Sequence, residues 1–292
     1  MSTSDEAALT GARLMQPLIL NLAGTGMVPE RSRSPKVPLQ PSEIVADVLG
    51  AAALGVTIVH LHARDENDVP THRKEVYARI IGGIREHRPD LILCVSCSGR
   101  RTRSIEERAE VLELDGDLKP DMASLTVSSL NFSREASINP PEHVRDLAQR
   151  MLDRGIIPEV EIFDLGMVNI LKSLQRQGLV PLPAYANLLF GNAAGAQADF
   201  LEIGALASRL PDGTLWSMAG LGSSQLPVAA MAAAHAPGVR IGLEDNLWLD
   251  RGRTRLASNF DLVERVHRMA ELLDRPVMTP EHLRGLLGIE RR

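Results

Sequence analysis

The sequence predicts an α/β protein that folds as a single (β/α)8 barrel, and three observations lead to this expectation. Eight short apolar segments recur along the 292 residues, and each is followed by a longer segment in which apolar and charged residues follow helical spacing. Strands that alternate with helices form a parallel sheet, and eight such strands can close into a barrel. Aromatic residues make up only 3% of the chain, so aliphatic side chains must fill the core, which suits a helix-covered parallel sheet.

The predicted strands are short apolar runs rich in β-branched residues. They cover residues 17–23, 56–63, 91–98, 122–127, 156–163, 182–190, 215–220 and 239–245. The segments with helical spacing cover residues 42–54, 72–87, 104–114, 141–154, 165–177, 197–209, 225–235 and 257–274. Some of these helices have recognisable starts, such as Ser104, which is followed by acidic residues that complement the helix dipole.

The rest of the chain supports one domain. Residues 1–16 are polar and without strong periodicity, which predicts a short N-terminal tail before a catalytic domain over residues 17–292. An open doubly wound sheet is the alternative fold, but no GxGxxG motif follows the first predicted strand, which argues against a dinucleotide-binding version. The Pro-rich segment 29–41 is expected to form a loop at the catalytic face of the barrel, where it can serve as a lid.

Charge and cysteine content limit the partners. The 32 Lys and Arg residues against 37 Asp and Glu residues leave a net charge of −5, and no basic block suggests nucleic-acid or membrane-surface binding. No apolar run reaches the roughly 18 residues of a transmembrane helix. Two cysteines cannot form a disulfide framework, and no secretion signal opens the chain, so we expect a cytoplasmic protein that acts on small molecules.

The most informative motif is TIVHLHARD at residues 57–65. Alternate side chains of a strand share one face, so His60 and His62 point the same way. Two imidazoles near the carboxyl end of a barrel strand can chelate one divalent ion. The alternative is that one or both are hydrogen-bonded histidines of the core or rim.

A third ligand is expected from another strand end, because a catalytic zinc site has three protein ligands and one exchangeable position. The eighth predicted strand ends in Glu244 and Asp245, and in a closed barrel it pairs with the first strand and lies close to the second. Glu244 is the expected ligand, and Asp245 is the expected base or orienting group. Without the histidine motif, the pair would be interpreted as solvated acidic residues that cap the following segment.

Other predicted strand ends also carry polar residues, namely Ser96, Ser98, Ser124, Thr126, Glu159 and Glu161. Glu161 is expected to face the pocket, because a carboxylate inside a strand is costly to bury unless it is paired or wet; a place at the surface edge is the equal alternative. Cys94 and Cys97 lie three residues apart and face opposite sides of a strand, so we expect them to pack in the core.

Seven stretches of the chain resemble the β-keto acid cleavage enzymes, in the order in which that family has them. They are PLILNLAGTGMVP (17–29), VHLHARDE (59–66), SCSGR (96–100), KPDMASLTVSSLNF (119–132), PEVEIFDLGMV (158–168), MAGLG (218–222) and RIGLEDNL (240–247). HLHxR and GxEDN together are specific.

The resemblance implies a zinc-dependent TIM barrel, a homotetramer or dimer, that reacts a 3-keto acid with acetyl-CoA to give acetoacetate and a new acyl-CoA by a retro-Claisen step. It implies that His60, His62 and Glu244 bind zinc and that Asp245 is the base, assisted by Arg240. It further implies a set of residues that hold the substrate or lie beside it, namely Ser96, Gly99, Ser124, Thr126 and Glu161. Since Arg240 and Asp245 have opposite parity along the strand, a bend at the strand end is needed to bring them together.

Two positions depart from the family pattern. Val28 stands where members that accept an amino-substituted keto acid have a Glu, and a valine cannot pair with a substrate ammonium group. We therefore expect a neutral, apolar or anionic side chain on the substrate. Ser223, Ser224 and Gln225 stand where some members carry bulkier or basic residues, which also leaves the substrate open.

Two other functions remain possible from the sequence. One is a metal-dependent aldolase or decarboxylase that stabilises an enolate without CoA, and the other is a non-catalytic metal-binding barrel. Two histidines and a carboxylate also suit Fe(II) or Mn(II), so zinc rests largely on the resemblance.

Overall fold

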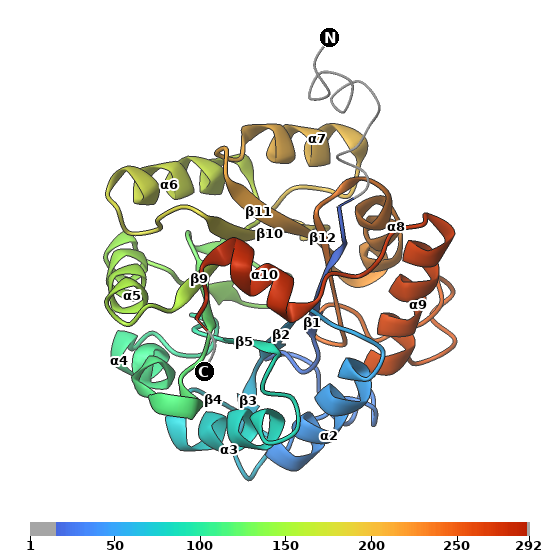
Figure 1. Cartoon of the computed structure of the whole chain (residues 1–292), viewed down its shortest axis with the longest axis horizontal. Helices are drawn as coiled ribbons and strands as arrows, with labels where there is room; N and C mark the ends of the chain where they lie inside the picture. The colour runs from blue at the N-terminus through green and yellow to red at the C-terminus, as the bar shows by residue number, and fades with distance from the viewer. Residues whose placement is uncertain (1–15, 291–292) are drawn as a thin grey trace.

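Eight parallel strands close into a barrel in the computed structural model, which describes residues 16–290 (Figure 1). The barrel order is β1-β12-β11-β10-β9-β6-β5-β2, so neighbours along the chain are neighbours in the sheet, apart from two short hairpins. The predicted (β/α)8 barrel is confirmed. The N-terminal tail predicted over residues 1–16 lies outside the described residues except for Gln16.

Each barrel strand overlaps one of the eight predicted segments. The strands are β1 (Ile19–Ala23), β2 (Ile58–Leu61), β5 (Ile92–Val95), β6 (Met122–Thr126), β9 (Ile157–Ile162), β10 (Ala184–Phe190), β11 (Thr214–Gly220) and β12 (Gly238–Ile241). The last prediction was wrong at its end, because β12 stops at Ile241 and residues 242–245 form a turn. Glu244 and Asp245 therefore follow the strand instead of belonging to it.

Helices separate the strands and cover the outside of the barrel (Figure 1). They are α2 (Pro41–Ala52), α3 (Lys74–Arg85), α4 (Ile105–Ala109), α5 (Pro141–Asp153), α6 (Leu165–Arg176), α7 (Phe200–Arg209), α8 (Gln225–His235) and α9 (Asn259–Leu272). The helix predicted over 104–114 is shorter than expected, since a 3-10 helix over Glu110–Glu113 follows α4. Ser104 caps α4 as predicted, because its hydroxyl accepts a hydrogen bond from the Glu107 amide at 3.2 Å.

A further helix, α10 (Pro280–Leu287), was not predicted from the sequence. It lies across the end of the barrel that faces the viewer in Figure 1. Leu283 and Leu287 of this helix pack with Ile19, Ile58 and Ile92, which come from the starts of three strands. The helix therefore covers the apolar interior at the amino-terminal end of the barrel and leaves the carboxyl edge for the site.

Two hairpins project from the strand ends. One joins β3 (Ala63–Arg64) to β4 (Pro70–Thr71), and the other joins β7 (Leu130–Asn131) to β8 (Ala136–Ser137).

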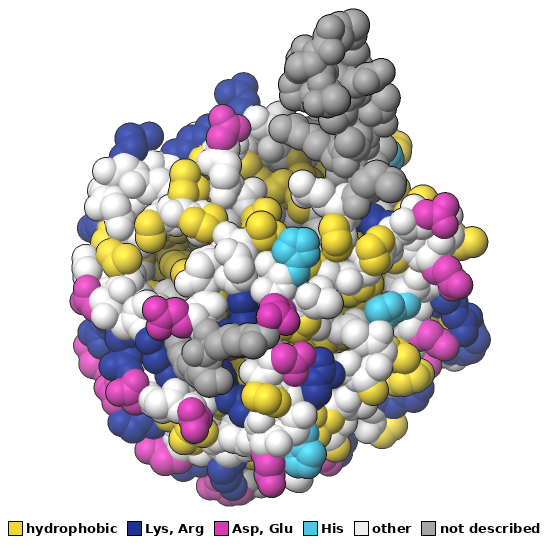
Figure 2. Space-filling model, viewed as in Figure 1, with side chains coloured by type: hydrophobic (Ala, Val, Ile, Leu, Met, Phe, Trp, Pro, Cys, Tyr) yellow, Lys and Arg dark blue, Asp and Glu magenta, His cyan; other side chains and the backbone are white. Residues whose placement is uncertain are grey.

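On the face seen in Figure 2, acidic and basic side chains are interspersed around the rim. Within residues 16–290, no helix has the length and apolar character needed to cross a membrane.

Candidate active site

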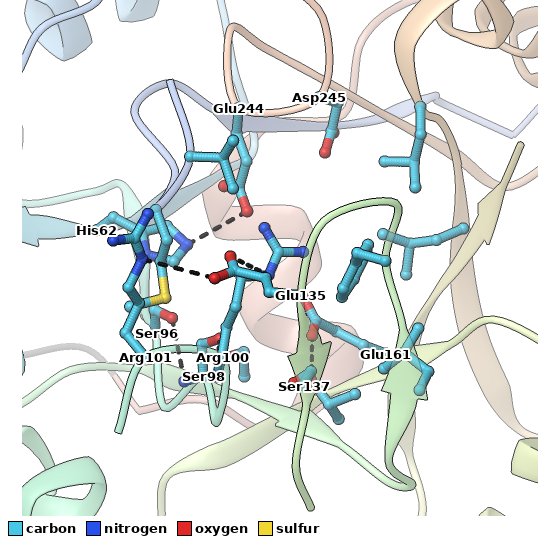
Figure 3. A pocket seen from close by; sticks show the side chains of 18 of the residues that line it. His62, Ser96, Ser98, Arg100, Arg101, Glu135, Ser137, Glu161, Glu244 and Asp245 are labelled. Atoms are coloured by element: carbon cyan, nitrogen blue, oxygen red, sulfur yellow. Dashed lines mark hydrogen bonds and ion pairs between the residues drawn. The ribbon is translucent and has the colours of Figure 1, made fainter. Parts of the chain in front are cut away.

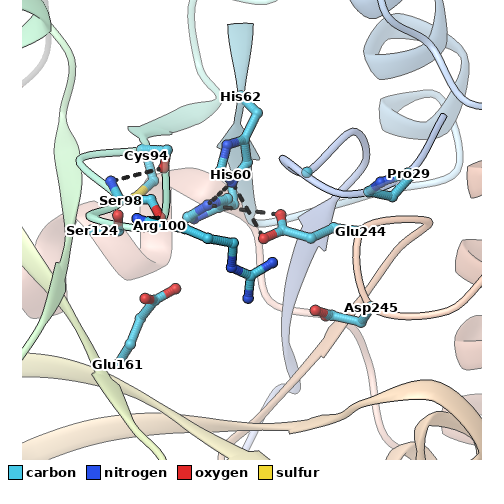
Figure 4. A network of polar contacts seen from close by, with 12 residues as sticks. Pro29, His60, His62, Cys94, Ser98, Arg100, Ser124, Glu161, Glu244 and Asp245 are labelled. Atoms are coloured by element: carbon cyan, nitrogen blue, oxygen red, sulfur yellow. Dashed lines mark hydrogen bonds and ion pairs between the residues drawn. The ribbon is translucent and has the colours of Figure 1, made fainter. Parts of the chain in front are cut away.

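The two histidines of the sequence motif meet at the carboxyl end of β2. His60 and His62 are 2% and 5% exposed, and their Nε2 atoms lie 3.2 Å apart. Both side chains are on the same side of the strand, as the spacing predicted, and Figure 4 shows them with Glu244 at one point. Two nitrogen lone pairs at this separation repel each other unless a proton or a cation lies between them.

Glu244 reaches the histidines because β1 lies between β2 and β12. Ala23 of β1 pairs with His60, while Leu22 pairs with Ile241, the last residue of β12. The chain then turns at Gly242, which has a φ of +148°, a value that glycine adopts readily and other residues rarely adopt. A Cβ atom at this position would lie 1.9 Å from the Ala23 carbonyl oxygen. The turn places the Glu244 carboxylate beside the two imidazoles.

The three side chains form a compact set of metal-ligand atoms. Glu244 Oε1 lies 3.2 Å from His62 Nε2, and Glu244 Oε2 lies 3.8 Å from His60 Nε2. The three ligand atoms all lie within 4.8 Å of one another. Glu244 Oε2 is buried and accepts no hydrogen bond from the described residues, so it is free to bind a cation. These residues fit a divalent ion such as zinc, with a fourth position open.

Burial and neighbouring charges shift the pKa values of the three side chains in this cluster. Burial alone would raise the pKa of Glu244, but His62 and Arg240 hold it well below its usual range. Burial would lower the pKa of His60, but the carboxylates of Glu159 and Glu244 outweigh burial and raise it. His62 has a lowered pKa, because burial outweighs the attraction of Glu244. Glu244 is therefore an anion, and His62 favours the neutral form that binds a metal.

Arg240 and Asp245 form a buried pair next to the cluster. Arg240 Nε lies 3.1 Å from Asp245 Oδ2, and Arg240 Nη2 lies 3.2 Å from Asp245 Oδ1. The bend that the sequence required is present, since β12 ends one residue after Arg240. Burial raises the pKa of Asp245, although the Arg240 guanidinium opposes that rise.

Glu161 completes the group from the opposite side of the barrel. It follows Glu159 on β9, and its Oε1 atom lies 3.5 Å from Arg240 Nη1. Thr126 of β6 donates a hydrogen bond to its other oxygen. Burial raises the pKa of Glu161, which Arg240 partly offsets. Figure 4 shows Glu161, Glu244 and Asp245 pointing toward a common space.

A cavity of about 350 Å³ opens above these residues (Figure 3). Most of the metal-binding, catalytic and substrate-binding residues expected from the sequence line it, namely Val28, His62, Ser96, Ser124, Thr126, Glu161, Arg240, Glu244 and Asp245. His60 lies beneath the cavity and does not line it.

Gly99 is the exception among the expected substrate residues, because it does not line the cavity. A Cβ atom at Gly99 would lie 2.4 Å from the Ile138 carbonyl oxygen and 2.9 Å from Arg108 Nη1. The glycine therefore permits a close approach between the loop after β5 and the hairpin β7–β8. Its position points to packing of the cavity wall.

Several residues of the site were missed by the sequence analysis. Arg64, the last residue of HLHxR, donates hydrogen bonds to the Gly26 and Pro29 carbonyl oxygens at 2.8 and 2.9 Å. It thereby holds the loop after β1 against Glu244, which packs under Gly26, where a Cβ atom would lie 2.7 Å from the Glu244 side chain. The place of Arg64 shortly after the two histidines of the motif is the sequence signal that could have identified it.

The mouth of the cavity carries arginines that were also missed. Arg100 stacks on the Phe132 ring, with its guanidinium carbon 3.7 Å from the ring centroid, and lies 3.8 Å from the Glu135 carboxylate. Other charged residues line the same mouth, namely Glu30, Arg33, Arg101 and Arg134. Four arginines against two glutamates give this mouth a positive balance that suits anionic ligands.

In barrels of this kind the chemistry takes place at the carboxyl edge of the strands, and the ligand cluster lies at that edge here. Fold and site together thus define a barrel enzyme with a ligand set suited to a divalent cation. The sequence model of the beta-keto acid cleavage enzyme family matches residues 17–289. The chain belongs to this family, and it is an enzyme of the acyltransferase, C–C bond-cleaving type.

Two curated relatives cover nearly the whole chain. A 3-keto-5-aminohexanoate cleavage enzyme of Fusobacterium nucleatum is 33% identical over 95% of this chain and 100% of its own length. A 3-oxoadipate:acetyl-CoA acetyltransferase of Cupriavidus necator is 36% identical over 94% of this chain and 96% of its own. Among solved structures, apo ObcA has a TM-score of 0.76 at 21% identity, over 88% of this chain and 66% of that chain, and supports the fold.

Proposed function

We propose that this enzyme condenses a 3-keto acid with acetyl-CoA and releases acetoacetate and a new acyl-CoA. The observation that carries the proposal is the buried Arg240–Asp245 pair beside the cluster of His60, His62 and Glu244. A base next to a cation site is what proton removal from a carbon between a ketone and a carboxylate requires. The printed names of the relatives, which include an acetyl-CoA acetyltransferase of a keto acid, support the same reaction.

The proposed metal is zinc, held by His60, His62 and Glu244. When bound, it supplies a positive charge that stabilises the negative charge developing on the keto oxygen. Asp245 takes the proton from the carbon between the ketone and the carboxylate. Arg240 holds both oxygens of Asp245 and so fixes the direction of that carboxylate. Glu161 and Thr126 line the same cavity as Asp245. Ser96 and Ser124 also line it, and their hydroxyls can position the substrate carboxylate.

The reaction balances without any further reactant. The deprotonated carbon attacks the acetyl carbonyl of acetyl-CoA and expels the CoA thiolate. The thiolate then attacks the carbonyl carbon of the original ketone. The bond between this carbonyl carbon and the carbon that Asp245 deprotonated then breaks. That carbon recovers its proton from Asp245, which leaves acetoacetate and the new acyl-CoA.

The proposed substrate has no positive charge on its side chain. Val28 lines the cavity and offers no carboxylate to an ammonium group, while the mouth is rich in arginine. A neutral, apolar or anionic side chain suits this lining. A high rate with 3-keto-5-aminohexanoate, together with no turnover of straight-chain keto acids, would contradict the proposal.

A panel of 3-keto acids with acetyl-CoA tests the reaction, with acetoacetate and each new acyl-CoA as the products measured. Cleavage that proceeds equally without acetyl-CoA would instead support the aldolase or decarboxylase. A purified protein that binds a divalent metal but turns over no member of the panel would support the non-catalytic metal-binding barrel.

His60→Ala tests the ligand set directly. The variant is expected to lose zinc and to lose turnover with every substrate of the panel, because two ligands cannot hold a catalytic ion firmly. Metal analysis and the acetoacetate assay check both effects. A variant that retains most of its activity would overturn the assignment. His282→Ala, at an exposed position on α10, is the matched control and is expected to keep both zinc and activity.

We also propose a cytoplasmic homo-oligomer, either a tetramer or a dimer. Phe200 and Leu201 at the start of α7 are 83% and 81% exposed, and a subunit contact would cover such side chains. Cys94 and Cys97 are free and buried, which suits a reducing compartment. Light scattering of the purified protein measures the mass, and a monomer at micromolar concentration would contradict the oligomer.

A further inference from the structure

A carboxylate that the proposed reaction does not use lies inside the barrel, directly beneath the histidine cluster. Glu159 of β9 is fully buried, and its Oε2 atom lies 2.5 Å from His60 Nδ1. The histidine thus presents one ring nitrogen to Glu159 and the other to His62 and Glu244. In the closed barrel β2 and β9 are separated by β5 and β6, and the two buried side chains meet in the barrel interior.

Glu159 has donors on both of its oxygens. Asn21 Nδ2 of β1 donates to Oε1 at 2.7 Å, and the Cys94 thiol of β5 donates to Oε2 at 3.3 Å. An ionised carboxylate only accepts hydrogen bonds, so these contacts require that His60 carries a proton on Nδ1. A neutral imidazole that carries its proton on Nδ1 has its lone pair on Nε2, and in His60 this nitrogen faces the ligand cluster.

A second layer of side chains keeps Glu159 in place. Asn21 Nδ2 also lies 3.3 Å from the hydroxyl of Tyr185, and this hydroxyl lies 2.6 Å from Ser217 Oγ. Asn21, Tyr185 and Ser217 are each fully buried and come from β1, β10 and β11. The carboxylate is therefore held by groups from several strands and has little freedom to move.

We propose that Glu159 is the positioning residue for the metal ligand His60, because its carboxylate fixes the ring orientation and the tautomer that present Nε2 to the ion. The inference rests on the proposed metal set of His60, His62 and Glu244. A carboxylate that accepts the second N–H of a ligand histidine makes the imidazole a stronger ligand, and its loss typically weakens metal binding 10- to 100-fold.

The same atoms could be interpreted as a second metal site, because His60, Cys94 and Glu159 also bring three ligand atoms within 4.8 Å. The direct contacts of Glu159 with His60 and Cys94 argue against a second metal site. His60 Nδ1 and the Cys94 thiol both contact one oxygen of Glu159, so the donor protons occupy the space that an ion would need. Burial raises the pKa of the Cys94 thiol well above its usual value, which keeps the proton on the sulfur.

The test compares Glu159→Gln with Glu161→Gln. Both substitutions remove one negative charge from β9 at nearly constant volume, but Glu161 contacts Thr126 and Arg240 and no histidine. Zinc is removed from each purified protein, and its affinity is measured by competition with a chromophoric chelator. We expect Glu159→Gln to bind zinc 10- to 100-fold more weakly than the natural protein and Glu161→Gln to bind it within about threefold.

Equal zinc affinity of the natural protein and Glu159→Gln would overturn the inference, and so would an equal loss in both variants. If the natural protein itself binds no zinc, the proposed metal site fails instead, so the two failures are distinguishable. Thermal unfolding of the zinc-free proteins separates a loss of ligand quality from a loss of fold.

A second measurement needs no variant and covers the case in which Glu159→Gln does not fold. Histidine labelled with ¹⁵N in the zinc-loaded natural protein reports the proton on each ring nitrogen of His60. We expect a protected proton on Nδ1 and none on Nε2. A missing Nδ1 proton, or one that exchanges as fast as that of an exposed histidine, would overturn the inference, whereas a proton on Nε2 would contradict the proposed metal set.

Discussion

Arg240 contacts three carboxylates from inside the barrel, and these contacts differ from one carboxylate to the next. Both oxygens of Asp245 contact its guanidinium, whereas Glu244 is contacted through one oxygen, with Nη2 to Oε1 at 3.1 Å, and Glu161 at 3.5 Å. Glu244 is strongly stabilised as an anion, so it is a good ligand and a poor base. Asp245 has a raised pKa, because burial outweighs the guanidinium, and this raised pKa supports the proposal that Asp245 is the base.

Asp245→Asn is the residue-scale prediction that follows. The amide keeps the shape of the side chain and one acceptor for Arg240, but it cannot take a proton. We expect kcat to fall by about 10²- to 10⁴-fold while zinc content stays the same. Steady-state kinetics and metal analysis check this outcome. Asp212→Asn, at an exposed position in the turn before β11, should leave kcat unchanged. Near-normal kcat in Asp245→Asn would exclude Asp245 as the base.

Sequence reasoning at this scale found the residues that stand in short motifs. It identified His60 and His62 from their spacing, because alternation along a strand is a local property. It named Glu159 among the polar residues of the strand ends but gave this residue no role. The burial of Glu159 against His60 depends on strands that lie 99 residues apart in the chain, and no local pattern contains that contact.

At the scale of elements, the start of α9 links the two loops that carry the site. Asn259, the first residue of α9, donates to the Gly24 carbonyl oxygen at 3.0 Å and accepts from the Leu243 amide at 2.9 Å. It also donates to the Asp47 carboxylate of α2 at 2.7 Å. One buried amide thus holds the loop after β1, the turn before Glu244 and a neighbouring helix together.

Asp47 makes this junction sensitive to pH. Burial raises the pKa of Asp47 to about 6, although the hydrogen bond from Asn259 lowers it in part. A carboxyl group whose pKa is higher in the folded state stabilises the fold when it is protonated. This contribution is complete below pH 4 and is lost as the pH rises through about 6.

Asp47→Asn should remove this contribution, because the amide is neutral at every pH and its oxygen can still accept from Asn259. We expect the free energy of unfolding of the variant, relative to that of the natural protein, to be higher at pH 7.5 than at pH 4.5. Urea unfolding at the two pH values measures the change. Parallel curves of unfolding free energy against pH for the two proteins would contradict the assignment to Asp47.

At the scale of the whole molecule, α10 closes the end of the barrel opposite to the site. Arg284 of α10 contacts Asp121 through two hydrogen bonds, at 2.9 Å to Oδ1 and 3.0 Å to Oδ2. It also donates to the Asp90 and Leu91 carbonyl oxygens at 3.1 and 2.9 Å. Arg85 is a second partner of Asp121, at 3.2 Å. The last helix is therefore fastened to the starts of β5 and β6.

Arg284→Ala should destabilise the barrel by about 3 kcal/mol, because it leaves the buried Asp121 with only part of its pairing. Arg268→Ala is the matched control. Arg268 is 71% exposed and pairs with Glu264 on the surface of α9, so its loss should cost less than about 0.5 kcal/mol. Denaturant unfolding measures both values. Equal losses in the two variants would show that the contact with Asp121 contributes little.

We further infer that residues 17–292 unfold as one domain, because β12 closes the barrel against β1 and α10 packs on the end of that barrel. A single cooperative transition is expected in the same experiment. Two separate transitions would contradict a single domain.

The sequence by itself determined the alternation of strands and helices, the closed barrel of eight strands and the histidine pair at the end of β2. These features follow from periodicity, which depends on neighbouring residues. Only the tertiary structure decided that β12 ends before Glu244, that Gly99 is not among the residues that line the cavity and that α10 covers the barrel. Those outcomes depend on register, on close approaches of backbone segments and on contacts between distant strands. Closure of the barrel creates these contacts, and no segment of the chain contains them alone.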